Sequence, residues 1–153
     1  MKRRALSLIL VIILTVCILS TECFATENDT KTEVIFLEDG GYIITTIQES
    51  MTRATNTKSG TKKNTRYNND GSLAWQITLS GTFTYTGTTS TCTASSISVN
   101  IYDSAYSKVS SSSSKSGNTA NGSATISRKV LGVTVATNTY PLSLSCDKNG
   151  NLY

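Results

Sequence analysis

The chain contains no histidine. This absence removes the commonest general base, the usual zinc ligand, and the Ser–His and Cys–His pairs of nucleophilic catalysis. Only three carboxylates follow Glu49, namely Asp70, Asp103 and Asp147, and each stands beside turn-forming residues. Aspartates in turns usually accept backbone N–H groups, and a glycosidase-type pair drawn from these three is the remaining catalytic alternative. We therefore expect no catalytic residue and no enzymatic activity.

The segment Asp147–Asn151 resembles the opening of a calcium loop, with oxygen ligands at alternating positions. It lacks the glycine that such loops have at the sixth position, where this chain has Leu152, and it ends without a bidentate glutamate. We expect a plain turn here, and no metal or cofactor.

The N-terminus has the pattern of a secretory signal peptide. Lys2, Arg3 and Arg4 precede a mostly apolar run from Ala5 to Leu19, and cleavage is expected after Ala25. The run is shorter than the roughly 20 residues that span a bilayer. We expect a protein secreted from the cell, and an uncleaved N-terminal membrane anchor is the alternative.

Two cysteines remain after residue 25, Cys92 and Cys146. An even pair in an exported chain predicts one disulfide, which would stabilise the fold by roughly 4 kcal/mol in the chain-entropy model. Two separate buried thiols are the alternative.

Residues 26–153 contain eleven basic and nine acidic residues, which argues against bulk binding of nucleic acid. Within them lies a basic segment free of acidic residues: Arg53, Lys58, Lys62, Lys63 and Arg66. It could bind an anionic polymer or headgroup. The alternative is a solvated linker followed by an edge strand that its lysines keep soluble.

The strongest structural pattern runs from Leu73 to Tyr85. Its odd positions are apolar or aromatic apart from Gly81, and its even positions are small and mostly polar. This period-two alternation predicts a strand with one buried face, and it makes Trp75 a core anchor. The next run, Cys92–Ile101, changes phase, so we expect a β-bulge near Ser95 and Ser96.

Turn-rich segments divide the rest of the chain into short strands. A hairpin is expected around 38–41, a polar linker over 50–61, and further turns at 68–71, 103–104 and 132. Pro141 should lie at a sheet edge, a bulge or a crossing. The prediction is all-β: an antiparallel two-sheet sandwich of about eight strands, immunoglobulin-like in general architecture. The expected organisation is a signal peptide (1–25), a leader with a hairpin and linker (26–60), and a sandwich domain (61–153).

Several motifs resemble those of a family of small proteins exported by Gram-positive, largely gut-dwelling bacteria. The main ones are Asn69-Asp-Gly-Ser-Leu-Ala-Trp75, Thr91-Cys-Thr93 and Leu144-Ser-Cys-Asp-Lys-Asn-Gly150. That family is defined only as a domain of unknown function. The resemblance covers the chain from about Tyr42 onwards and implies bacterial export and a β fold. It carries over no catalytic or binding residue.

The expected function is a secreted, non-enzymatic interaction or adhesion module for an unidentified extracellular polymer or protein. The alternatives are an antimicrobial or toxin-like factor and a structural component of the extracellular matrix. We expect a monomer that contacts no nucleic acid and, after signal cleavage, no membrane. A sugar-stacking surface is a further hypothesis, built on five tyrosines: Tyr67, Tyr85, Tyr102, Tyr106 and Tyr140.

Overall fold

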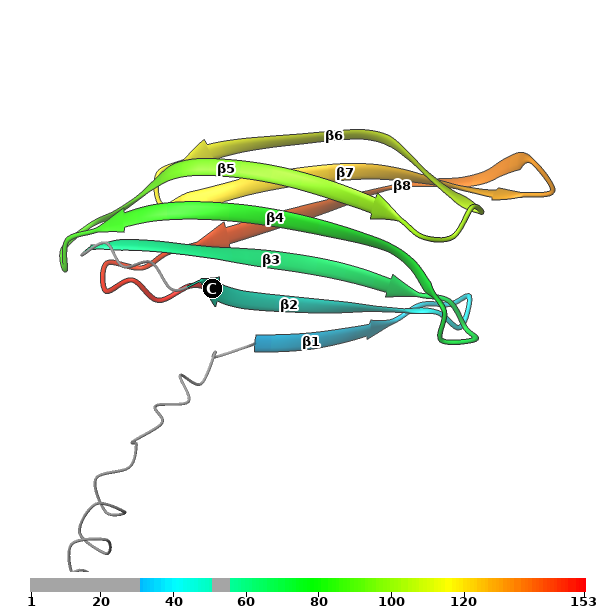
Figure 1. The fold of residues 1–153 in the computed structure, drawn as a ribbon, viewed down its shortest axis with the longest axis horizontal. Helices are drawn as coiled ribbons and strands as arrows, with labels where there is room; N and C mark the ends of the chain where they lie inside the picture. The colour runs from blue at the N-terminus through cyan, green and yellow to red at the C-terminus, as the bar shows by residue number, and fades with distance from the viewer. Residues whose placement is uncertain (1–30, 51–55) are drawn as a thin grey trace, which may run out of the picture.

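A computed structural model describes residues 31–50 and 56–153. The expected signal peptide (1–25), the start of the leader and Arg53 lie outside these residues. The described chain forms eight antiparallel strands in two sheets and no helix (Figure 1). The strands are β1 (Lys31–Phe36), β2 (Tyr42–Ser50), β3 (Thr57–Tyr67), β4 (Leu73–Tyr85), β5 (Ser90–Ile101), β6 (Tyr106–Ser116), β7 (Thr119–Val130) and β8 (Val133–Ser145).

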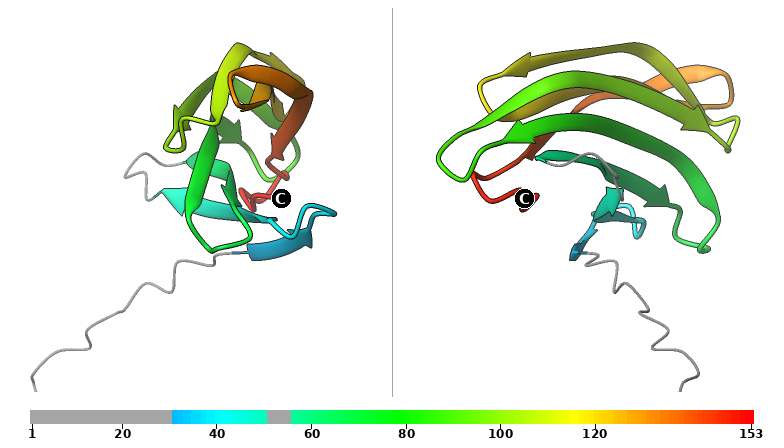
Figure 2. Two further views of the ribbon diagram at one scale, coloured as in Figure 1. Left: turned by 90° about the vertical axis from the view of Figure 1, so that its right-hand side faces the viewer. Right: turned by 60° about the vertical axis from the view of Figure 1, so that its left-hand side comes forward.

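The two sheets form a sandwich, as the strand pattern predicts. One sheet has the order β1-β2-β3-β4-β5 and the other β6-β7-β8. The larger sheet is strongly curved, and the smaller one packs across β4 and β5 on its concave side (Figure 2). The end of the chain covers part of the concave side that the smaller sheet leaves open. There Leu152 packs at Gly60 of β3, and Lys31 of β1 donates a hydrogen bond to the Leu152 carbonyl (3.1 Å).

The core is built on β4, and the alternation in its sequence explains why. Its odd positions from Trp75 to Phe83 are buried and face the smaller sheet, whereas its even positions from Gln76 to Thr82 are only partly buried. Trp75 is fully buried, with its ring 4.6 Å from that of Tyr140 on β8. From the smaller sheet, Ala120, Ala124, Ile126, Leu142 and Leu144 complete the core.

Two paired glycines let bulky side chains approach the larger sheet. Gly60 and Gly81 are direct partners on β3 and β4. A Cβ at Gly60 would collide with the Leu152 side chain, and a Cβ at Gly81 would lie 2.7 Å from the Phe83 ring. The missing side chains therefore make room for Leu152 and Phe83 in the core.

The predicted bulge in β5 exists, but it lies earlier in the strand. Thr82 pairs with Ala94 and Phe83 with Cys92, so Thr93 is the extra residue. The hydroxyl of Thr93 donates a hydrogen bond to the Thr82 carbonyl (3.1 Å). That bond anchors the bulge opposite the β4 residue at which the register shifts.

The predicted linker is only partly a linker. β2 continues to Ser50 and β3 begins at Thr57, so residues 57–60 belong to a strand within one continuous sheet. Within this stretch the closeness of Leu152 excludes a side chain at Gly60. Pro141 lies in β8, an edge strand that pairs only with β7, as expected for a residue without an N–H.

Candidate functional site

A polar cleft of about 370 Å³ opens at one end of the sandwich. Three turns meet there: β1–β2, β3–β4 and β5–β6 (Figure 1). Strands β3, β6 and β7 also contribute side chains, so the cleft draws on both sheets. Its lining residues are Asp39, Arg66, Asn68, Asn69, Asp70, Asp103, Ala105, Tyr106 and Arg128.

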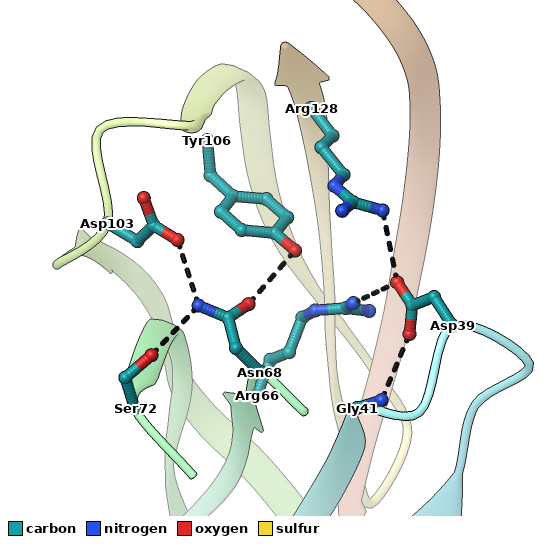
Figure 3. Close-up of polar contacts among 8 residues, drawn as sticks. All are labelled: Asp39, Gly41, Arg66, Asn68, Ser72, Asp103, Tyr106 and Arg128. Atoms are coloured by element: carbon teal, nitrogen blue, oxygen red, sulfur yellow. Dashed lines mark hydrogen bonds and ion pairs between the residues drawn. The ribbon is translucent and has the colours of Figure 1, made fainter. Parts of the chain in front are cut away.

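Asp39 joins two arginines across the mouth of the cleft (Figure 3). Its Oδ2 lies 2.5 Å from Arg66 Nη2 of β3 and 3.2 Å from Arg128 Nη1 of β7. Its Oδ1 accepts the backbone N–H of Gly41 (3.2 Å), so its own turn fixes the orientation of the carboxylate. The three side chains therefore tie the β1–β2 turn to both sheets.

The neighbours of Asp39 keep its carboxyl ionised. Burial alone would raise the pKa of Asp39. The hydrogen bond from Arg66, the Gly41 N–H and the charges of both arginines outweigh burial, and the pKa lies below its ordinary value. Burial likewise works to lower the pKa of Arg66, but the bond to Asp39 reverses this, and the net shift is upward.

Arg66 is the least exposed charged residue of the cleft. Its guanidinium carbon lies 5.4 Å from the centre of the Tyr106 ring, which is a cation–π geometry. Its Nε has no hydrogen-bond partner in the structure. Because a buried N–H without a partner is costly, this atom is an unsatisfied donor in the wall of the cleft.

Asn68 connects the β3–β4 turn to the β5–β6 turn and to the start of β6 through its side chain (Figure 3). Its Nδ2 donates to Asp103 Oδ2 (2.9 Å) and to Ser72 Oγ (3.1 Å). Its Oδ1 accepts the hydroxyl proton of Tyr106 (3.3 Å). The wall of the cleft is thus a connected polar network whose geometry is set before any ligand binds.

The turn aspartates do what the sequence predicts of them. Asp70 accepts the backbone N–H of Ser72 (2.9 Å), and Asp103 accepts that of Ala105 (2.8 Å). Asp147 accepts the N–H groups of Asn149 and Asn151, and hydrogen bonds lower the pKa of both Asp70 and Asp147. Asp70 and Asp103 both line the cleft, which the sequence did not indicate. Over residues 31–50 and 56–153, no group of three or more acidic or cysteine side chains could hold a metal ion.

The basic segment does not form one patch. Lys58 pairs with Glu49, and Arg66 lies in the cleft. Lys62 lies opposite the buried Leu79 on the neighbouring strand, and Lys63 lies opposite Thr78. These two lysines are adjacent in β3 and therefore point to opposite faces of the sheet. Only part of this segment therefore serves any one surface.

The predicted disulfide between Cys92 and Cys146 is absent, and both residues are buried free thiols. The Cys92 thiol points to the Ala94 carbonyl (3.3 Å) and the Cys146 thiol to the Asp147 carbonyl (3.4 Å). Each thiol thus has a local acceptor, and burial raises the pKa of both. Both side chains belong to the hydrophobic core.

The five tyrosines of the sugar-stacking hypothesis are scattered. Tyr106 lies in the cleft and Tyr140 against Trp75, whereas Tyr102 is exposed. Tyr67 instead stacks on Tyr42 with ring centres 5.0 Å apart, and Phe36 lies 6.1 Å beyond Tyr42. Because Tyr42 and Tyr67 cover each other's ring faces, they form a cross-strand ladder more than an open platform.

The cleft could be predicted only in fragments. The sequence predicts turns at 38–41 and 68–71, which contain Asp39 and Asn68, but no local pattern links these two residues to each other or to Arg128. The only sequence signal that Asp39 and Asn68 lie close together is that both belong to turns that alternate along the chain with long strands. In an up-and-down arrangement such turns gather at the same end.

Comparison with protein-family models, with curated proteins and with solved structures gives no match for this chain. The fold and the cleft define a small antiparallel β-sandwich with a polar end cleft. The described residues include no helix that is long and apolar enough to cross a membrane.

Proposed function

We propose that the protein is an exported, non-enzymatic binding module that holds its ligand in the cleft at the end of the sandwich. The observation that carries this proposal is the polar network around Asp39, Arg66 and Asn68, in which side chains from both sheets are locked in place. Preorganised polar groups in a concave site favour specific binding, because little side-chain freedom is lost when the ligand arrives. Export is inferred from the signal-like N-terminus.

The chemistry of the cleft favours binding over catalysis. A general acid near neutral pH needs a raised pKa, whereas the pKa values of Asp39 and Asp70 are lowered. Asp70 and Asp103 are also engaged by the backbone of their own turns. Asp39 and Asp70 are therefore suited to accepting hydrogen bonds and poorly suited to donating protons.

The composition of the cleft points to a neutral ligand rich in hydroxyl groups, such as a segment of extracellular polysaccharide. Three carboxylates and two guanidinium groups nearly balance in charge, and amides lie between them. A hydroxyl group can donate to Asp70 or Asp103 and accept from the Arg128 guanidinium, which is partly exposed. A strongly charged polymer would be attracted by some of these groups and repelled by others, so it would gain less binding free energy from the cleft.

The test is binding to purified peptidoglycan, mucin and neutral polysaccharides, with wall teichoic acid as an anionic comparison. Asn69→Ala and Arg128→Gln remove lining groups and spare the core, so each should weaken binding about tenfold if one or two good hydrogen bonds are lost. Lys148→Gln, in the turn after β8 at the opposite end, is the matched control and should bind as the wild type does.

Two results would overturn the proposal. Binding that neither cleft variant weakens would place the ligand elsewhere on the molecule. Turnover of a glycosidase, esterase or peptidase substrate that survives repurification, and is lost on Asp70→Asn or Asp103→Asn, would make the cleft an active site.

A further inference from the structure

The β7–β8 hairpin carries an apolar tip that packs against no part of the core. In Figure 1 the hairpin, drawn in orange, extends beyond the other strands at the cleft end of the sandwich. Leu131 at its apex is 99% exposed, and Val130 and Val133 beside it are 47% and 66% exposed. Val135 follows at 56%, so four large apolar side chains meet solvent on one projection.

The backbone of this turn makes the leucine harder to explain by folding alone. Leu131 and Gly132 both have positive φ, 51° and 81°, and Val130 pairs with Val133 across them. A two-residue turn of this kind strongly prefers Asn or Asp before glycine, because L-residues with larger side chains are strained there. Leu131 thus adds backbone strain and exposed apolar surface and contributes nothing to packing, which points to a contact outside the chain.

All the charged residues of the sheet that bears the tip are basic. Between Asp103 and Asp147 the sequence contains Lys108, Lys115, Arg128 and Lys129 and no acidic residue. Lys129 is exposed and stands directly behind the apolar tip, where it pairs with Thr134. Apolar side chains at the apex with a cation one step behind match the layering of a bilayer, whose acyl chains lie beneath anionic headgroups.

We propose that the tip of the β7–β8 hairpin inserts into the interface of a lipid membrane that carries anionic headgroups. Leu131, Val130 and Val133 enter the acyl boundary, and Lys129 stays at the headgroup level. A protein partner fits less well, because a stable interface needs roughly 800 Å² from each side and a tip of four side chains cannot supply it. The sequence alone led us to expect no membrane contact after signal cleavage, so the hairpin changes that expectation.

The experiment is co-sedimentation of the protein, purified from the medium of a secreting culture, with vesicles of phosphatidylcholine alone or mixed with phosphatidylglycerol. The wild type should bind the mixed vesicles, and salt should weaken this binding. Leu131→Asn should reduce the partition coefficient at least about tenfold, given the apolar area of one leucine. Lys129→Gln should reduce it about fivefold on anionic vesicles only.

Leu131→Asn should remove the apolar side chain without destabilising the turn, because asparagine tolerates positive φ. The matched control is Phe36→Thr, which removes an aromatic side chain that is 80% exposed on the far edge of the other sheet. It should bind vesicles as the wild type does, and so should the cleft variant Asn69→Ala.

Vesicle binding that Leu131→Asn leaves unchanged, or that Phe36→Thr reduces equally, would overturn the proposal. So would a wild type that binds neither vesicle. A wild type that binds no vesicle but forms a dimer, which Leu131→Asn abolishes, would show that the tip docks on a second copy of the chain instead.

Discussion

Arg66 and Asp39 are 27 positions apart in the chain, yet their side chains meet at 2.5 Å and hold the β1–β2 turn against β3. Arg66 is buried and Asp39 only partly so. This asymmetry makes the pair informative, because removal of the carboxylate leaves a charge that water cannot easily reach. The cleft therefore has a structural requirement of its own, independent of any ligand.

Asp39→Asn should lower the free energy of unfolding by about 1–3 kcal/mol. A fully buried pair that loses one partner costs about 3–5 kcal/mol, and partial solvation of Asp39 reduces that cost. Urea unfolding followed by tryptophan fluorescence measures it. Arg128→Gln removes the more exposed arginine from the same carboxylate and should cost less than about 1 kcal/mol. Equal losses in the two variants would contradict this account.

The same pair predicts how stability depends on pH. The pKa of Asp39 is lower in the folded protein than in the unfolded chain. Its contribution is therefore complete above the unfolded pKa, about 4, and is lost as the pH falls through the folded pKa. The stability difference between wild type and Asp39→Asn should be constant from pH 5 to 7 and shrink below about pH 4. A difference that persists unchanged at pH 2 would mean that the asparagine acts through packing.

Trp75 is the single tryptophan of the sequence, so its fluorescence reports directly on the core. It is fully buried, and its Nε1 has no hydrogen-bond partner. Trp75→Ala should cost about 3–5 kcal/mol through the cavity it leaves. Trp75→Phe should cost clearly less, since it also removes an unpaired N–H whose burial costs about 1–3 kcal/mol. Native emission should be blue-shifted and move to the red in denaturant, and emission near that of free tryptophan would place the ring at the surface.

The local patterns of the sequence predicted the strands well, because each depends on neighbours along the chain. The alternation around Trp75 fixes the buried face of β4, and the turn at Asp70 is encoded by its own hydrogen-bonding residues. The cleft depends on contacts that no local pattern records, such as Asp39 with Arg128. The prediction of a linker over Thr57–Gly60 was wrong for the same reason. A polar stretch with a glycine resembles a linker, and the packing of Leu152 at Gly60 is a contact between distant parts of the chain.

The N-terminal pattern predicts that the protein leaves the cell and begins at Thr26. Residues 1–25 lie outside the described structure, whereas Lys31 already pairs with Ile47 in the first strand. Cleavage after Ala25 would thus precede the described fold by a few residues. N-terminal sequencing of the protein from culture medium checks this, and full-length chain recovered only from the membrane fraction would indicate an anchor.

Cys92 and Cys146 should behave as two protected thiols. Burial shields both side chains and raises the pKa of each, so at neutral pH little reactive thiolate is present. In the native protein at pH 7, alkylation with iodoacetamide should be slow. In denaturant without reductant, both residues of the chain that begins at Thr26 should react and the intact mass should increase by two adducts, since Cys17 and Cys23 lie in the expected signal peptide. Cys92→Ala and Cys146→Ala each leave one thiol, and each should then give a single adduct. A native mass two hydrogens below that of the reduced chain, with no alkylation until reductant is added, would show that the cysteines are joined after all.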